Sequence, residues 1–438
     1  GPGPTDGYVG APGQGSTGVR AVRVEGAAGT PGEAILLAHD VTIGPSTRLR
    51  FRVHPAARAG GEPDRYLATY LGLALELADG TVLAANLRDQ YGVSLDAHAQ
   101  GEAKHLWVGQ WNEVTCDLDP ALAGQVVTRI LVRCDAPDAT TTADEPLVAW
   151  IDDVALAPNS LAPINPSPEP HPSPADLVDT RRGSHSTFHF SRGNTFPATA
   201  VPNGFTLTSP MTARALDWFY SWSAHNTPAG RTPFHGFVLS HQPSPWMGDR
   251  NQVIINAAPT DSPELATFSH DNEVAHPFHY RLTRDDGVVA EAIPTDHGAA
   301  LRFTGLDSSP LLLSITGGDG ESHVSLDVAA GSATGWVDGG SVLSVGRSRL
   351  YFYASIDNVS PASTTVRIAT SHLSTAQARH AWDLEFTSHD AVLTWQDLRD
   401  RARTAWHERL RVLEIPGSTP EQAVTAYSNL YRLNLYPT

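Results

Sequence analysis

The stretch FHGFVLSHQPSPWMGD, residues 234–249, gathers side chains that could bind a polar ligand. His241 and Gln242 can exchange hydrogen bonds, Trp246 offers an apolar ring face, and Asp249 offers a carboxylate acceptor. Two prolines between them cannot pair into the middle of a sheet, so they predict a stiff loop after a buried strand. A stacking ring beside a hydroxyl acceptor is the arrangement expected of a sugar subsite. The alternative is that Trp246 fills a gap between two sheets.

A second group of candidate residues lies earlier, within residues 182–218. Gly193 would let a ligand approach backbone N–H groups closely. Arg192 and Asn194 could hydrogen-bond hydroxyl groups, and Trp218 could stack on the apolar face of a ring. The alternative is a set of turns joining short strands, with the aromatic residues around Trp218 filling strand positions.

Histidine is abundant in this chain, but its spacing does not predict a metal site. The sequence contains 19 histidines, and neither the group His270, His276 and His279 nor the pair His185 and His189 has the His-Glu-x-x-His spacing. A nucleophile elbow and a phosphate-binding loop are also missing from the sequence. We therefore predict no metal ligands from this spacing. Carboxylates are plentiful, so the pattern alone neither locates nor excludes a general acid and base pair.

Charge and cysteine content limit the class of protein. The formal net charge of −17 argues against a nucleic-acid partner, and no apolar run reaches membrane-spanning length. The two cysteines, Cys116 and Cys134, could pair in a disulfide in a secreted protein. The alternative is two buried thiols on neighbouring strands.

The elements that must position these residues are mainly β-strands. Residues 1–19 are rich in Gly and Pro and predict a flexible lead. Residues 20–157 and 176–390 contain short apolar or alternating runs separated by turn residues, which predict two antiparallel β-sandwiches. Prolines recur through residues 158–175 and predict an extended linker without ladder pairing. The run ARHAWDLEF, residues 378–386, is assigned to a strand of the second sandwich.

Helical periodicity begins only in residues 391–438. Apolar residues from Trp395 to Leu410 recur at helical spacing. Thr419 and Gln422 can form a capping box at the start of a second helix, with Pro420 at its first position. The apolar stripe of that helix consists of Val424, Tyr427, Leu430 and Tyr431. We expect further helices to be needed to cover this stripe.

Several short segments of the chain carry a family resemblance when they are taken together and in order. They are Gly193–Pro197, Val201–Gly204, Ser209–Pro210, Trp218, Gly236–His241 and Gly248–Asp249. This set resembles the N-terminal sandwich of glycoside hydrolase family 92, whose members are calcium-dependent exo-acting α-mannosidases. The closing run AYSNLYRLNLYPT resembles the helix with which the second domain of that family begins, and residues 20–157 resemble a carbohydrate-binding jelly roll.

The resemblance implies a mainly β protein whose helices lead to an (α/α)6 barrel that is absent from this chain. In the family that barrel carries the catalytic carboxylates and the calcium ligands, so we expect the calcium cofactor to bind there. The residues expected to contact substrate are Arg192, Gly193, Asn194, Trp218, His241, Trp246 and Asp249.

The function expected from the resemblance is that of a non-catalytic N-terminal portion of a secreted bacterial inverting α-mannosidase. Its substrates would be the mannose residues, with or without phosphate, of N-glycans. We expect the remainder of the enzyme, as a second chain, to be its partner, and residues 1–438 alone to be inactive. The alternative is a glycan-binding or adhesion protein of two sandwiches without catalysis.

Overall fold

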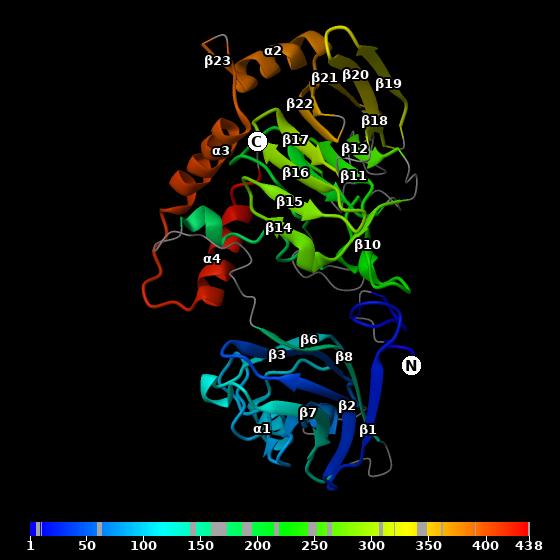
Figure 1. Ribbon diagram of the computed structural model, residues 1–438, viewed down its shortest axis with the longest axis vertical. Helices are drawn as coiled ribbons and strands as arrows, with labels where there is room; N and C mark the ends of the chain where they lie inside the picture. The colour runs from blue at the N-terminus through cyan, green and yellow to red at the C-terminus, as the bar shows by residue number, and fades with distance from the viewer. Residues whose placement is uncertain are drawn as a thin grey trace. The chain divides into compact units, whose positions relative to one another are not determined.

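The computed structural model divides the chain into two compact units, each of which is described here by itself (Figure 1). The first contains Gly1–Ala162 and the second contains Arg231–Thr438 with most of the residues between. Most of the predicted linker, residues 159–172, lies outside the described residues. The residues that the structure describes are 1–5, 9, 11–58, 64–140, 146–158, 173–185, 195–213, 219–243, 252–260, 265–305, 310–318, 320–339, 348–360, 362–389 and 391–436.

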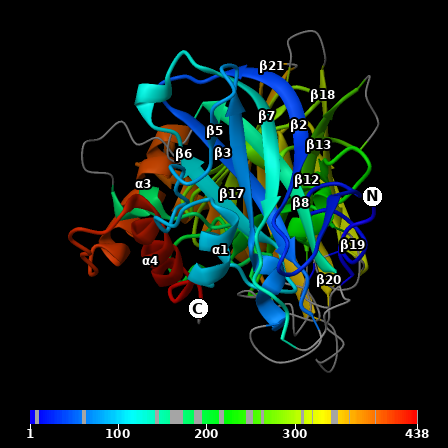
Figure 2. The same cartoon turned by 90° about the horizontal axis from the view of Figure 1, so that it is seen from below.

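The first unit is an antiparallel β-sandwich, as the sequence predicts (Figures 1 and 2). Apolar residues from both sheets, such as Leu49, Phe51 and Leu73, form its buried core. One sheet has the order β1 (Val22–Gly26), β8 (Leu147–Pro158), β3 (Thr47–Pro55) and β6 (Asn112–Asp117). The other has the order β2 (Gly32–Thr42), β7 (Val126–Cys134), β4 (Leu71–Leu77) and β5 (Val82–Leu83). The helix α1 spans Ala97–Ala103, and Asp96 caps its N-terminus.

The lead is fastened to the first unit, so the prediction of a flexible segment was wrong for the part of residues 1–19 that is described. The N-terminal amine of Gly1 donates to the carbonyl oxygen of Ala21. The backbone N–H groups of Ser16 and Thr17 both donate to the carboxylate of Asp152 on β8. The Gly and Pro content indicated conformational freedom of the backbone in the isolated segment. In the folded unit, these hydrogen bonds hold the backbone of the lead in place.

The two cysteines are free and buried, so the predicted disulfide is not formed. Cys116 lies on β6 and Cys134 on β7, which belong to different sheets. The alternative of thiols on neighbouring strands was therefore also wrong about their placement. Burial raises the pKa of the Cys116 thiol to about 11, which keeps it protonated and unreactive at neutral pH.

The second unit is also built on two antiparallel sheets, and a core that includes Phe237, Ile255, Phe303 and Phe352 lies between them. The smaller sheet has the order β18 (Leu311–Gly317), β12 (Val253–Pro259), β11 (Gly236–Ser240) and β9 (Leu207–Met211). The larger has the order β14 (Glu273–Ala275), β15 (Tyr280–Thr283), β16 (Val289–Pro294), β17 (Gly298–Thr304), β22 (Ser363–Ser371), β21 (Ser348–Ser360), β20 (Ser332–Gly339) and β19 (Ser322–Asp327). Two short hairpins pair β10 (Thr232–Pro233) with β13 (Thr267–Phe268) and β23 (Thr387–Ser388) with β24 (Ala391–Val392).

Helices α2 (Thr375–Phe386), α3 (Trp395–Leu410) and α4 (Pro420–Arg432) follow the sheets and are drawn in orange and red in Figure 1. The predicted helices α3 and α4 are confirmed, with capping boxes at Thr394 and Thr419. The strand predicted for residues 378–386 was wrong, because this segment forms α2. Its buried residues Ala378, Ala381, Trp382 and Phe386 recur at three and four positions, which is a helical period.

The apolar stripe of α4 is covered only in part within the second unit, because Tyr427 and Tyr431 are buried whereas Val424 and Leu430 stay partly exposed. The expectation that further helices complete its cover therefore stays a prediction. Tyr431 packs against Trp406 of α3, with ring centroids 5.0 Å apart, and donates to the carbonyl oxygen of Ala198. Tyr427 donates to the carbonyl oxygen of Leu413 at 2.8 Å. The loop that contains Ala198 and the helix α3 thus pack against the tyrosines of α4. None of the helices in the described residues has the length and hydropathy of a membrane span.

Candidate functional site

One of the predicted substrate-binding residues, His241, can be located in the structure. The strand before it is buried throughout, as predicted: all five residues of β11 are inaccessible to solvent. The other predicted residues lie outside the described residues and stay predictions. They are Arg192, Gly193, Asn194, Trp218, Trp246 and Asp249.

The backbone of β11 brings His241 to the edge of the smaller sheet. Phe237 pairs with Ile255 of β12 and with Pro210 of β9, so β11 is held on both sides. Gly236 has φ of 132°, and a Cβ atom there would lie 2.6 Å from the carbonyl oxygen of Ile255, so glycine is required. The chain then turns sharply after His241, because Gln242 has φ of 45°. The start of the predicted stiff loop is therefore anchored by a fully paired strand.

The ring of His241 stacks on Phe205, with centroids 4.0 Å apart and planes inclined by 25°. Its Nδ1 atom lies 2.7 Å from the carbonyl oxygen of Phe205. Since a carbonyl oxygen can only accept, Nδ1 carries the proton, and Nε2 is the nitrogen that gains or loses a proton with pH. The backbone and the ring of Phe205 together fix the orientation of this imidazole.

Two further imidazole rings contact Phe205. His297, in the turn between β16 and β17, stacks on it at 5.0 Å and 22°. His372, just after β22, meets Phe205 edge-on at 5.7 Å and meets His241 edge-on at 5.1 Å. We call these four residues, Phe205, His241, His297 and His372, the Phe205 cluster. It presents aromatic surface and ring nitrogens together, which is a combination suited to a ligand with apolar faces and hydroxyl groups.

A carboxylate lies against one imidazole of the cluster, that of His297. His297 Nδ1 lies 2.7 Å from Glu385 Oε1, at the end of α2, and the backbone N–H of His297 donates to the same carboxylate. Asp296 Oδ2 lies 3.6 Å from His297 Nδ1. The hydrogen bond to Glu385 outweighs partial burial and raises the pKa of His297 above its usual value. The raised pKa favours the protonated form of the ring, which donates hydrogen bonds more strongly than the neutral form.

The same residues are the group in the described part of the chain whose donor atoms could together hold a metal ion. One donor atom from each of Asp296, His297 and Glu385 lies within 4.8 Å of the others. This set offers one nitrogen and carboxylate oxygens, far from the about six to eight oxygens that calcium takes. His297 Nδ1 is already engaged with Glu385, so the observed arrangement is an ion pair.

A shallow depression of about 580 Å³ lies beside the Phe205 cluster. It is lined by Asp296, which precedes His297 of the cluster, and by residues of the turn 201–203 and of α3. The turn is held from the helical side, since Arg409 donates to the side chain of Asn203 at 3.0 Å. The backbone N–H of Asn203 donates to the carbonyl oxygen of Asn434 after α4. Helices α3 and α4 therefore position the turn that leads into Phe205.

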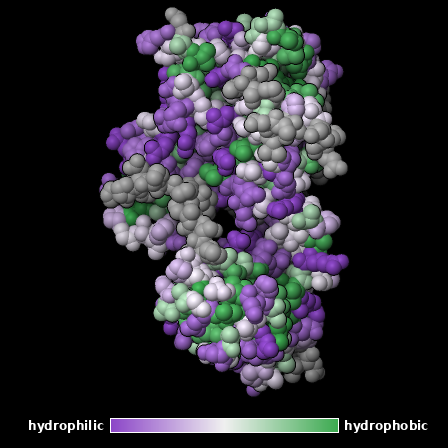
Figure 3. Space-filling view, in the orientation of Figure 1, coloured by the Kyte–Doolittle hydropathy of each residue, from purple (hydrophilic) through white to green (hydrophobic). Residues whose placement is uncertain are grey.

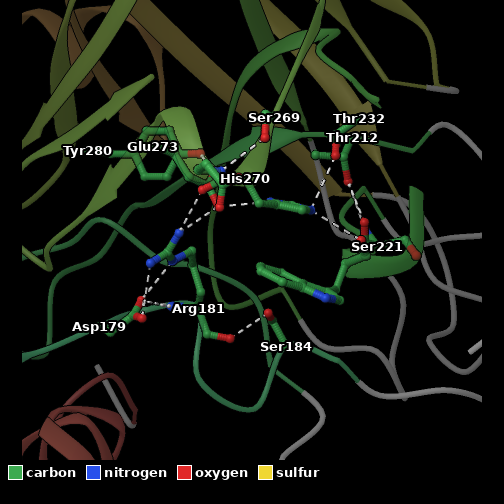
Figure 4. Close-up of polar contacts among 12 residues, drawn as sticks. Asp179, Arg181, Ser184, Thr212, Ser221, Thr232, Ser269, His270, Glu273 and Tyr280 are labelled. Atoms are coloured by element: carbon green, nitrogen blue, oxygen red, sulfur yellow. Dashed lines mark hydrogen bonds and ion pairs between the residues drawn. The ribbon is translucent and has the colours of Figure 1, made fainter. Parts of the chain in front are cut away.

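A second histidine–carboxylate pair lies in the second unit, within a buried network (Figure 4). His270 Nδ1 is 2.9 Å from Glu273 Oε1, and Arg181 lies between Glu273, at 3.3 Å, and Asp179, at 2.9 Å. Burial alone would raise the pKa of Glu273, but His270, Arg181 and the hydroxyl of Tyr280 lower it to about 2. This network ties residues 179–181 to β14 and β15.

Sequence reasoning missed Phe205, His297, His372 and Glu385 as members of the site. They come from four segments between residues 205 and 385, and no local spacing connects them. The pairing of β17 with β22, which sets Gly298 opposite Ala369, brings the turn at His297 and the strand end at His372 to the same region. Only the sheet topology could have revealed this proximity.

Comparisons with known proteins agree with this organisation. The family model described as the glycosyl hydrolase family 92 N-terminal domain matches residues 177–401. A solved inverting mannosidase of that family from Bacteroides thetaiotaomicron is 26% identical, with a TM-score of 0.53, covering 60% of this chain and 40% of that one. A family 92 α-mannosidase from the same organism, solved with mannoimidazole, is 19% identical with a TM-score of 0.50 and supports the fold.

The second comparison covers 61% of this chain and 40% of that chain. This chain therefore spans about 40% of the length of these two solved relatives. No curated protein sequence matches it. The matched residues 177–401 include Phe205, His241, His297, His372 and Glu385, and so the whole Phe205 cluster with its carboxylate.

Proposed function

The chain belongs to glycoside hydrolase family 92, and from that premise we propose that it supplies the sugar-contacting sandwich of an α-mannosidase. The Phe205 cluster would form part of the rim of the mannose site. The predicted residues Trp218, Trp246 and Asp249 would extend that rim, because the loop from His241 to Asp249 begins at the cluster.

The observation that carries the proposal is the fixed orientation of His241. Its ring is stacked on Phe205 and bonded through Nδ1, at the first residue of the loop that the family resemblance singles out. Rings held in place before binding lose little freedom when a sugar arrives, which favours affinity. The ring of His297, which stacks on the same Phe205 and whose pKa Glu385 raises, adds a further hydrogen-bonding group for a sugar hydroxyl.

Asp296 and Glu385, the carboxylates beside the Phe205 cluster, are poor candidates for the catalytic acid and base. An inverting glycosidase needs its two carboxyl groups about 6.5–9.5 Å apart, with a water between one of them and the sugar. Asp296 and Glu385 have donor oxygens within 4.8 Å of each other, and Glu385 is engaged by three hydrogen bonds from His297. We therefore propose that the acid, the base and the calcium ligands belong to the region by which the solved relatives are longer.

The finer parts of the proposal rest on the family resemblance. They are inversion at the anomeric centre, dependence on calcium, secretion by a bacterium, and action on mannose or phosphorylated mannose of N-glycans. A net charge of −17 argues against nucleic acid as the ligand. Under this proposal the chain alone binds a mannose-type ligand weakly and turns over no substrate.

Binding and turnover can be measured separately on residues 1–438. Saturation-transfer NMR with mannoimidazole should show magnetisation transfer to the ligand, and His241→Ala should abolish it. His380→Ala is the matched control, because His380 is an exposed histidine on α2 of the same unit. Loss of transfer in both variants, or no transfer to the unmutated chain, would exclude the site.

Turnover is tested with an aryl α-mannoside and calcium. No release of the aryl group is expected from the chain alone. Steady hydrolysis would show that the catalytic carboxylates lie on this chain, contrary to the proposal. Binding of mannoimidazole without turnover after the remainder of the enzyme is supplied would instead favour the alternative, a glycan-binding protein.

A further inference from the structure

Two aromatic rings of the first unit are unusually exposed. Tyr91 is 67% exposed and Trp107 is 70% exposed, whereas Trp111 and Tyr70 of the same unit are 9% and 7% exposed. Figure 3 shows that hydrophobic side chains reach the surface of the first unit in patches bordered by hydrophilic ones. Exposing two large rings forgoes the free energy of burying them, so their position calls for a functional explanation.

Both rings stand on loops that are fastened to the same strand, β6. The side chain of Gln90, next to Tyr91, donates to the carbonyl oxygen of Glu113 at 2.8 Å and accepts from the backbone N–H of Thr115 at 2.9 Å. It thus occupies the hydrogen-bonding edge of β6 as a further strand would. The Tyr91 loop is held beside the first half of β6.

The Trp107 loop is held by the first residue of β6. Asn112 Oδ1 accepts from the backbone N–H of Trp107 at 2.9 Å. Asn112 Nδ2 donates to the carbonyl oxygens of Trp107 at 2.9 Å and of Gln110 at 3.0 Å. Gln90 holds the Tyr91 loop against β6, and Asn112 of β6 holds the Trp107 loop at the start of the same strand. The two loops are therefore neighbours.

Buried polar groups make the Tyr91 loop rigid. Asp89 is 7% exposed, and its Oδ1 atom accepts from the backbone N–H groups of Tyr91 and Val93, both at 2.9 Å. Its Oδ2 atom accepts from the side chain of Gln100, itself 3% exposed, at 2.9 Å. A carboxylate in this setting fixes the turn, so the ring of Tyr91 is displayed from a set backbone.

The rings are accompanied by exposed hydrogen-bonding side chains. His105 is exposed and meets Tyr91 edge-on at 4.9 Å, and Arg88 is exposed on the same turn. Flat rings beside donors and acceptors match the alternating apolar faces and hydroxyl edges of a sugar chain. A protein partner would instead need about 800 Å² of complementary surface, much more than two rings provide.

We propose that the Tyr91 and Trp107 loops form a carbohydrate-binding site of the first unit, in which the two rings stack on sugar residues of a glycan chain. This site lies on a different unit from the Phe205 cluster and uses none of its residues. Because both units are on one chain, capture of a glycan by the first would raise the concentration of that glycan around the second.

Affinity electrophoresis of residues 1–438 in native gels tests the site. Gels contain α-mannan, a soluble β-1,4-glucan or xylan, so that the arms distinguish which sugar chain is held. We expect retardation in at least one gel, weakened at least about fivefold in apparent affinity by Trp107→Ala and further by Tyr91→Ala. Trp107→Phe, which keeps a ring, should retain part of the retardation.

The matched control is Ile35→Ala, which removes an apolar side chain that is 58% exposed on β2 of the other sheet. It should leave retardation unchanged, and circular dichroism should show that every variant is folded. His241→Ala separates the two sites, because it should abolish mannoimidazole binding and leave retardation in the β-1,4-glucan or xylan gel intact. No retardation in any of the three gels, or retardation that survives in the Trp107→Ala, Tyr91→Ala double variant, overturns the proposal.

Discussion

The second unit contains the same chemical pair twice, in two different settings. His270 Nδ1 and Glu273 Oε1 are 2.9 Å apart, and His297 Nδ1 and Glu385 Oε1 are 2.7 Å apart. The side chains of the first pair are 13% and 0% exposed, whereas those of the second are 38% and 15% exposed. Distance and residue type therefore do not distinguish a structural pair from a candidate ligand-binding pair.

What distinguishes them is how the remaining groups are occupied. His270 Nε2 lies 3.2 Å from the hydroxyl of Thr232, its ring is covered by Trp222 at 3.8 Å, and Glu273 also binds Arg181. Every strong group of that pair is used to hold the fold. His297 instead packs its ring on Phe205 at 5.0 Å and remains partly open to solvent. Partial exposure of an oriented ring is what a binding site requires.

The largest expected effect comes from breaking the buried network at its arginine. Arg181→Ala leaves Glu273 and Asp179 buried without their counter-charge, and we expect a loss of about 3–5 kcal/mol in the free energy of unfolding of the second unit. Urea unfolding measures this loss. Arg411→Ala removes an exposed ion pair with Glu408 at the end of α3 and should cost about 0.5 kcal/mol or less. A loss at Arg181 as small as that control would contradict the structural role of the network.

Glu385→Gln should have a smaller effect on stability. The amide can still accept from the backbone N–H of His297 but loses the charge that binds the ring, and we expect a cost of about 1 kcal/mol. The same urea experiment applies, with Asp383→Asn as the control on an exposed position of α2. If Glu385→Gln cost as much as Arg181→Ala, the two pairs would have the same role and the contrast between them would fail.

The smallest expected effect is a dependence of stability on pH. The folded state raises the pKa of His297 above 6.5, so it binds this proton more tightly than the unfolded chain does. The resulting stabilisation is fully present below the unfolded pKa and is lost as pH rises through the folded pKa. The difference in unfolding free energy between the unmutated chain and His297→Gln should therefore shrink as pH rises above about 6.5. A difference that grew with pH would contradict the predicted sign.

The sequence predicted those features that local rules control. The capping box at Thr419 and the buried strand before His241 follow from residue type and spacing, and both are confirmed. It failed at α2, where the apolar run around Trp382 is short enough to fit a strand or a helix. It also failed at the lead, because Asp152 is more than a hundred residues from the backbone groups that it binds.

The candidate site was predictable only at its one local component. His241 follows a recognisable strand, whereas His297 and His372 reach it through pairings between distant strands. Periodicity identifies which residues face a core, but it does not specify which strand ends meet. The residues that complete the Phe205 cluster therefore required the three-dimensional arrangement of the larger sheet.

Phe205 is attached to its neighbours mainly through its backbone. Its carbonyl oxygen accepts from His241 Nδ1, and its N–H donates to Asp296 Oδ1 at 3.0 Å. Any residue other than proline can make both bonds, so a substitution at position 205 exchanges the ring and keeps the anchors. A change of this one side chain therefore alters the ring that His241, His297 and His372 contact, while the two backbone hydrogen bonds at position 205 are kept.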